Sequence, residues 1–214
     1  MRFRDRGDAG SQLADRLAAL DLPRPVVLGL PRGGVPVAVE VAKRLAAPVD
    51  VFVARKVGAP GHPELGIAAV AEDSDTIVVT AAARQAGVDD AEMAELAARA
   101  RTELQRRVAA YRGNRALLSV TGRDVVLVDD GLATGVTAQA ALLALRERQP
   151  RQLVLAVPTC PPRTAALMAD FADQVVWVIA PEPFFAVGEW YDDFRQVTDE
   201  EVNELLATAV TDPL

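Results

Sequence analysis

Two adjacent carboxylates followed by a loop of small residues are the most distinctive chemical feature of this sequence. Asp129 and Asp130 come directly after the apolar run 125–128, and the turn 131–135 leads into a helical pattern. Small residues let the backbone approach a ligand closely, and the first N–H groups of a helix carry partial positive charge, so the turn is typical of a phosphate site. Adjacent carboxylates suit sugar hydroxyl groups or a hydrated magnesium ion. The stretch therefore predicts a pocket for a phosphorylated sugar.

A second set of residues predicts an anion site that faces the first. Arg32 follows one buried apolar run and precedes Gly33 and Gly34, while Arg55 and Lys56 end another such run. Because ligands bind at the carboxyl ends of parallel strands, we expect these residues to meet the acidic pair at one edge of a sheet. The basic side chains bring positive charge, and the glycines bring exposed backbone N–H groups. A diol-bearing sugar with phosphate groups at both ends would occupy both sites.

The sequence VVLVDDGLATGVT, residues 125–137, resembles the phosphoribosyl-pyrophosphate (PRPP) motif of type I phosphoribosyltransferases. It has the apolar strand, the acidic pair, three spacers and Thr-Gly-x-Thr. A Walker B strand or a receiver domain also combines an apolar run with Asp-Asp, but neither continues into Ala-Thr-Gly-x-Thr. The segment 30–34, Leu-Pro-Arg-Gly-Gly, is similar to the family's pyrophosphate loop, whose non-proline cis peptide would here be Pro31–Arg32. Arg55 and Lys56 match the basic pair that ends the following strand.

The resemblance implies a magnesium-dependent phosphoribosyltransferase that moves ribose 5-phosphate from PRPP to a nitrogenous, nucleobase-like acceptor and releases pyrophosphate. The cofactor would be Mg²⁺, and its expected ligands, partly through water, are Asp129 and Asp130. The expected catalytic residues are Asp129, Asp130, Arg32 and Lys56. The expected PRPP-binding residues are Gly33, Gly34, Arg55, Ala133, Thr134, Gly135, Val136 and Thr137.

The acceptor site is predicted from a cluster of aromatic residues near the C-terminus. The candidate acceptor-binding residues are Trp190, Tyr191, Phe184 and Phe185. Flat aromatic faces stack on planar heterocycles, although a surface loop pinned by its own aromatic side chains would give the same pattern. Ala133 stands where relatives acting on 6-oxopurines have an aspartate that meets the base, so the resemblance argues against hypoxanthine or guanine as the acceptor. Members of the family that act on adenine or orotate also have a small residue there, and the acceptor is not identified. Glu64 or Glu72 is a candidate to carry the acceptor's proton.

The hydrophobic pattern predicts the elements that position these residues. Continuous apolar runs indicate strands buried on both faces, as in a parallel sheet covered by helices. Strands are expected at 26–30, 49–54, 125–128, 153–157 and 175–179, and helices at 11–20, 35–45, 89–111, 138–148, 163–170 and 199–210. Residues 57–66 hold three glycines and two prolines, which predicts a long mobile loop. Segments 67–71 and 76–80 are expected to form an antiparallel hairpin.

The alternation of strands and helices predicts an α/β fold with a doubly wound, mostly parallel sheet, the Rossmann-like core that the resemblance also implies. We expect a single domain over residues 1–214, with the core at about 24–180, a flexible lid at about 57–80 and a small hood at about 181–198. The single cysteine, Cys160, excludes a disulfide framework. With no signal peptide or long apolar span, a cytoplasmic protein without membrane contact is expected. It is also expected to form a homodimer.

An alternative function is a PRPP-sensing regulator with little or no catalysis, and one version of this alternative also binds RNA. Its basic residues would be Arg99, Arg101, Arg106, Arg107, Arg112, Arg115 and Arg123. Arginines that alternate with acids on a helix more often form a solvated face. The formal net charge of −7 also opposes attraction to nucleic acid. Nucleic acid is therefore an unlikely partner, and PRPP with a small-molecule acceptor is the favoured pair.

Overall fold

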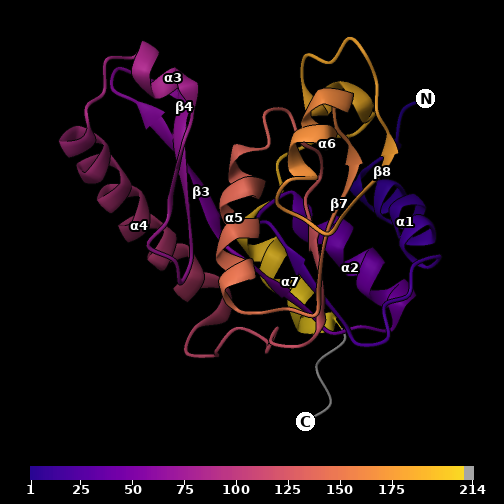
Figure 1. Cartoon of the computed structure of the whole chain (residues 1–214). Coiled ribbons are helices and arrows are strands. Elements are labelled where there is room, and N and C mark those ends of the chain that lie inside the picture. The colour runs from indigo at the N-terminus through magenta and orange to yellow at the C-terminus, as the bar shows by residue number, and fades with distance from the viewer. Residues whose placement is uncertain (210–214) are drawn as a thin grey trace.

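The core of the protein is a parallel sheet of five strands, seen in the computed structural model, which describes residues 1–209 (Figure 1). The strands lie in the order β2-β1-β6-β7-β8. Their bounds are Pro25–Gly29 for β1, Val49–Val51 for β2, Asp124–Val128 for β6, Gln152–Thr159 for β7 and Gln174–Ile179 for β8. Every neighbouring pair is parallel, and β1 and β6 lie in register at the centre. The predicted parallel core is therefore confirmed.

Helices cover both faces of this sheet. The helices against it are α1 (Arg6–Leu17), α2 (Gly34–Leu45), α5 (Val136–Glu147), α6 (Pro162–Met168) and α7 (Asp199–Thr208). Along β6, Val126 and Val128 pack with α1 and α2, whereas Val125 and Leu127 pack with α5 and α6. Successive strand residues point to opposite faces, so burial on both sides requires the continuous apolar runs seen in the sequence. The doubly wound arrangement is confirmed.

A second sheet projects from one end of the core as an arm (Figure 1). It is antiparallel and holds β3 (Ala54–Ala59), β4 (His62–Ala71) and β5 (Ile77–Val79), accompanied by α3 (Ala81–Gln85) and α4 (Asp90–Arg112). The predicted hairpin of 67–71 with 76–80 is confirmed as β4 with β5. The predicted loop at 57–66 is wrong, because β3 and β4 pair along it up to Ala59 opposite His62. The pairing shifts register on both sides of Gly58, which accommodates the glycines and prolines as an irregular hairpin.

The predicted strand 49–54 is also wrong in its second half. β2 ends at Val51, and after two residues the chain enters β3 of the other sheet. Arg55 and Lys56 therefore lie on the arm and not at the end of a core strand. The long helix α4 is confirmed with Asp89 as its N-cap, and α7 begins with a capping box formed by Thr198 and Glu201. The predicted end of the last helix at Val210 lies outside the described residues.

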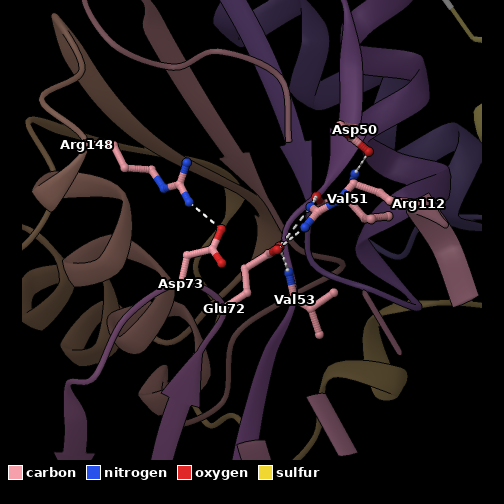
Figure 2. Close-up of polar contacts among 7 residues, drawn as sticks. All are labelled: Asp50, Val51, Val53, Glu72, Asp73, Arg112 and Arg148. Atoms are coloured by element: carbon pink, nitrogen blue, oxygen red, sulfur yellow. Dashed lines mark hydrogen bonds and ion pairs between the residues drawn. The ribbon is translucent and has the colours of Figure 1, made fainter. Parts of the chain in front are cut away.

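A buried ion pair stabilises the segment that connects the core sheet to the arm (Figure 2). Glu72 and Arg112 form a paired contact with both side chains almost fully buried. Arg112 Nη1 donates to Val51 O at 3.0 Å, and Val53 N donates to Glu72 Oε1 at 2.7 Å. These bonds satisfy backbone groups on both sides of the strand break, which would otherwise be buried without partners. The pair thus joins the end of β4, the end of α4 and the exit of β2.

Candidate functional site

The acidic pair lies against the glycine loop that follows β1. Leu30 N donates to Val128 O at 2.8 Å, which brings the ends of β1 and β6 together. The peptide bond Pro31–Arg32 is cis, as the resemblance implied. A Cβ atom added to Gly33 would lie 1.9 Å from Asp130 Oδ2, and one added to Gly34 would lie 2.6 Å from Val128 O. Only glycine fits at these two positions, so the expected pyrophosphate loop and acidic pair form one site.

Burial sets the electrostatics of the acidic pair. Desolvation raises the pKa of Asp129 well above its usual value, and the neighbouring Asp130 carboxylate raises it further. Burial also raises the pKa of Asp130, partly offset by the Arg6 guanidinium. Asp129 Oδ1 accepts a hydrogen bond from Asp130 N at 2.9 Å. Two closely spaced carboxylates with little solvation provide a strong site for a hydroxyl donor or a cation.

The donor set of this pair fits the magnesium ion that the family implies. Among residues 1–209 no cluster of three or more His, Cys, Asp or Glu side chains could hold a metal ion. Mg²⁺ does not need such a cage, because it is commonly held by one or two carboxylates while its other ligands are water and substrate phosphate oxygens. Asp129 and Asp130 would therefore hold the ion together with a bound phosphate compound.

The loop between β6 and α5 is held by hydrogen bonds to the end of β7 and to α6, and part of it is exposed to solvent. Leu132 N donates to Thr159 O at 3.0 Å, and Thr164 Oγ1 donates to Ala133 O at 2.8 Å. Ala133 and Thr134 themselves are exposed. Gly135 has a φ of +77°, a backbone conformation that disfavours residues with a side chain. It directly precedes α5, whose first N–H groups have no partner within the helix. The helix therefore begins beside an exposed loop, and the binding of a phosphate by its first N–H groups stays a prediction.

The basic residues predicted for the pyrophosphate are divided between two elements. Arg32 is partly exposed within the glycine loop beside the acidic pair. Lys56 is exposed on β3, where its Nζ donates to Glu64 O at 3.0 Å. Arg55 lies 4.0 Å from Glu103 of α4. Arg32 thus lies in the core loop that meets the acidic pair, whereas Arg55 and Lys56 lie on β3 of the arm.

The aromatic segment after β8 contains one buried acceptor candidate, Tyr191, and three candidates that are more exposed. Tyr191 is 1% exposed, packs against Phe3 and Phe194 with ring centroids 5.3 and 4.9 Å away, and donates from its hydroxyl to Asp130 O at 2.5 Å. It offers no free ring face, so the prediction that it stacks on an acceptor is corrected: it braces the acidic pair. Phe184 and Trp190 stack on each other at 6.3 Å, and Phe185 is 78% exposed.

Sequence reasoning missed Arg6 at this site. Its Nε lies 2.8 Å from Asp130 Oδ2, although the two residues are 124 positions apart. The Arg6 guanidinium also lies over the Phe194 ring, 4.0 Å from the centroid. The polar N-terminal segment gave no pattern that points to Asp130. Only the packing of α1 beside the sheet brings the two together.

The two glutamates proposed to carry the acceptor's proton, and the single cysteine, differ in their exposure. Glu72 is buried in its pair with Arg112, so it is not available to carry an acceptor's proton, whereas Glu64 lies exposed on the arm. Cys160 is fully buried, and burial raises the pKa of its thiol to about 11. At neutral pH this thiol is protonated and unreactive.

The arginines of α4 are largely paired with acids or backbone. Glu103 contacts both Arg106 and Arg107, and Arg101 Nη2 donates to Asp75 O at 2.5 Å. Arg112 is buried in the pair with Glu72. Glu103 therefore offsets part of the positive charge on this helix face.

The fold is that of an α/β protein whose central strands bring the glycine loop and the acidic pair together at one edge of the sheet. A model of the phosphoribosyl transferase domain matches residues 9–184, and the chain belongs to that family. A Mycobacterium tuberculosis protein, known from two strains and named only provisionally as a phosphoribosyl transferase, is 48% identical over 98% of this chain. The match covers 47% of that protein, so the chain spans about half the length of these curated relatives.

Two solved structures share the fold of this chain. The crystal structure of TT1426 from Thermus thermophilus is 48% identical, covers 96% of this chain and 98% of its own, and superimposes with a TM-score of 0.81. The AQ2163 protein of Aquifex aeolicus is 12% identical, covers 96% of this chain and 86% of its own, and has a TM-score of 0.52, a likeness of fold alone. None of the helices within residues 1–209 has the length and apolar character needed to span a membrane.

Proposed function

We propose that this protein transfers the ribose 5-phosphate group of PRPP to a nitrogen atom of a small planar acceptor and releases pyrophosphate. The observation that carries the proposal is the contact between the glycine loop and the acidic pair. Gly33 and Gly34 lie directly against Asp130 and the end of β6, and the anion loop 131–135 follows at once. A single molecule with a ribose diol between a 5-phosphate and a 1-pyrophosphate matches this order of sites.

The residues of this site would act by position and charge. Backbone N–H groups around Thr134 and Gly135 would hold the 5-phosphate, and Asp129 and Asp130 would hold the ribose hydroxyls. Arg32 with the N–H groups of Gly33 and Gly34 would neutralise charge on the pyrophosphate as its bond to C1 breaks and positive charge develops on the ribose ring. When bound, Mg²⁺ would supply further positive charge to the pyrophosphate oxygens.

The arm and the aromatic segment are the proposed surroundings of the acceptor. The tip of the β3–β4 hairpin is exposed from Pro60 to Leu65, as expected of an element that covers a bound ligand and excludes water. Lys56 would reach the pyrophosphate only if it left its present partner, the carbonyl group of Glu64. Phe185 has the most exposed ring of this segment and is the aromatic side chain that we propose to stack on an acceptor.

The experiment that tests the function measures pyrophosphate release. The protein is incubated with PRPP and Mg²⁺, alone and with a panel of purines, pyrimidines and other nitrogen heterocycles. We expect release to depend on at least one acceptor and to form the matching nucleotide. PRPP binding without turnover across a broad panel would instead favour the regulatory alternative. No binding of PRPP at all would refute both.

A further inference from the structure

The guanidinium group of Arg6 makes three contacts at the back of the acidic pair. Its Nε lies 2.8 Å from Asp130 Oδ2, its Nη1 donates to Arg195 O at 2.8 Å, and its Cζ lies 4.0 Å from the centre of the Phe194 ring. The side chains of Arg6 and Asp130 are only 11% and 15% exposed. An ion pair with so little solvent contact is weakly screened, and the ring below the guanidinium restricts its position.

Asp130 is held through its backbone as well as its side chain. The Tyr191 hydroxyl donates to Asp130 O, and the Tyr191 ring packs between Phe3 and Phe194. Phe3 is fixed in turn by backbone hydrogen bonds to Trp190 and Asp192, both 2.8 Å long. The residues Phe3, Arg6, Tyr191 and Phe194, which we call the clamp, therefore join the N-terminal segment to the acidic pair.

The clamp leaves one oxygen of Asp130 available. Arg6 contacts Oδ2, the oxygen that would come closest to a Cβ atom added to Gly33, and Oδ1 is the oxygen that this hydrogen bond leaves open to a ligand. A carboxylate that is fixed through one oxygen has its second oxygen fixed in direction. The rotational freedom that binding would otherwise remove is then already lost, which favours ligand affinity.

We infer that Arg6 is a positioning residue for PRPP: it orients Asp130 so that Oδ1 meets the ribose hydroxyl groups. This inference rests on the proposed function. Arg6 acts through Asp130 and does not itself touch the ligand. Two other roles for the contact make different predictions. A purely structural ion pair would affect stability but not ligand selectivity, and a latch that competes with the ligand would weaken binding in the wild type.

Isothermal titration with two ligands, PRPP and pyrophosphate, both with Mg²⁺, tests the inference. Arg6→Gln removes the charge and keeps a polar side chain, Arg6→Lys keeps the charge, and Arg44→Gln breaks an exposed ion pair with Asp15 as a matched control. For Arg6→Gln we expect the PRPP dissociation constant to rise roughly tenfold or more, because a misplaced Asp130 would lose about one charge-assisted hydrogen bond to a ribose hydroxyl group. Pyrophosphate affinity should stay unchanged, Arg6→Lys should recover part of the loss, and the control should match the wild type.

Several results would overturn the inference while the proposed function stands. These are unchanged PRPP affinity in Arg6→Gln, tighter PRPP binding as a latch predicts, or an equal loss for PRPP and pyrophosphate. If circular dichroism shows that Arg6→Gln does not fold, Phe194→Leu takes its place, because it removes the ring under the guanidinium. It should weaken PRPP binding selectively and by a smaller factor, and no selective loss there would also overturn the inference. A wild type that binds pyrophosphate but not PRPP would refute the function and the inference together.

Discussion

Gly33 and Asp130 lie so close that a single methyl group does not fit between them: a Cβ atom at Gly33 would come within 1.9 Å of Asp130 Oδ2. This contact joins the loop after β1 to the carboxylates after β6. The sequence predicted the glycine loop and the acidic pair separately. This contact shows that both belong to one site.

Gly33→Ala should therefore weaken PRPP binding by at least about tenfold, because the Asp130 carboxylate must move and lose its hydrogen bond to Arg6. Titration calorimetry with PRPP and Mg²⁺ measures the change. The control is Gly87→Ala, where φ is +71° and no atom would lie within 4 Å of the new Cβ, so backbone strain is present without a contact at the site. Equal PRPP affinity for Gly33→Ala and the wild type would contradict the close approach.

The buried pair of Glu72 and Arg112 predicts a large effect on stability. Glu72→Ala leaves the Arg112 charge and the Val53 N–H group buried without their partner, which should cost about 3–5 kcal/mol in the free energy of unfolding. Urea denaturation measures it. The adjacent Asp73 forms an ion pair with Arg148 near the surface, so Asp73→Ala should cost less than about 1 kcal/mol. Similar losses for the two variants would show that the crossing between the sheets does not depend on this pair.

Two acidic residues should change stability with pH in opposite directions. Burial raises the pKa of Asp50 above its usual value of 3.8, so the folded protein binds this proton more readily than the unfolded chain does. The wild type should therefore gain stability relative to Asp50→Asn as the pH falls from about 7 toward 4.

Glu103 provides the contrast, because hydrogen bonding to Arg106 lowers its pKa from 4.5 to about 2. Its stabilising contribution is present above pH 4.5 and is lost as the pH falls toward 2. The wild type should thus lose stability relative to Glu103→Gln on acidification. Thermal denaturation of the three proteins across this range gives both slopes, and slopes of the same sign would contradict the assignment.

The aromatic segment predicts a separation between acceptor and donor binding. Phe185→Ala should weaken acceptor affinity by about 1–3 kcal/mol, the loss of one stacked ring, and leave PRPP affinity unchanged. Tyr191→Phe should do the reverse, because it removes the hydrogen bond to Asp130 O and keeps the ring. Kinetics with the acceptor found by the pyrophosphate assay, together with PRPP titration, measure both effects. If Phe185→Ala turns over every acceptor as the wild type does, the acceptor lies elsewhere.

The core could be predicted from sequence because its signals are local. Strands buried on both faces must be continuously apolar, so β1, β6 and β7 were found to within a few residues. The acidic pair and both loops follow those strands directly, and their positions at one edge of the sheet follow from parallel topology.

The pairing of β3 with β4 and the clamp could not be predicted, for different physical reasons. Pro63 and three glycines argued against strands at 57–66, but the pairing of β3 with β4 tolerates them through its register shifts. β5 pairs with residues 68–70 of β4. Pro63 lies outside this stretch, so its missing N–H group removes no hydrogen bond between β4 and β5. The contact of Arg6 with Asp130 depends on how α1 packs, and no local pattern encodes it. Tyr191 was predicted to bind the acceptor because aromatic residues occur both in buried cores and at stacking sites. The sequence alone does not distinguish these two environments.

The most direct test of the account is the binding of PRPP to the acidic pair. Titration of the wild type with PRPP and Mg²⁺ should give saturable binding to one site per chain. The double variant Asp129→Asn and Asp130→Asn, shown to be folded by circular dichroism, should bind PRPP at least about tenfold more weakly, because it cannot supply the charge that holds the ribose and its ion. Equal binding by the folded double variant, or no binding by the wild type, would contradict the account.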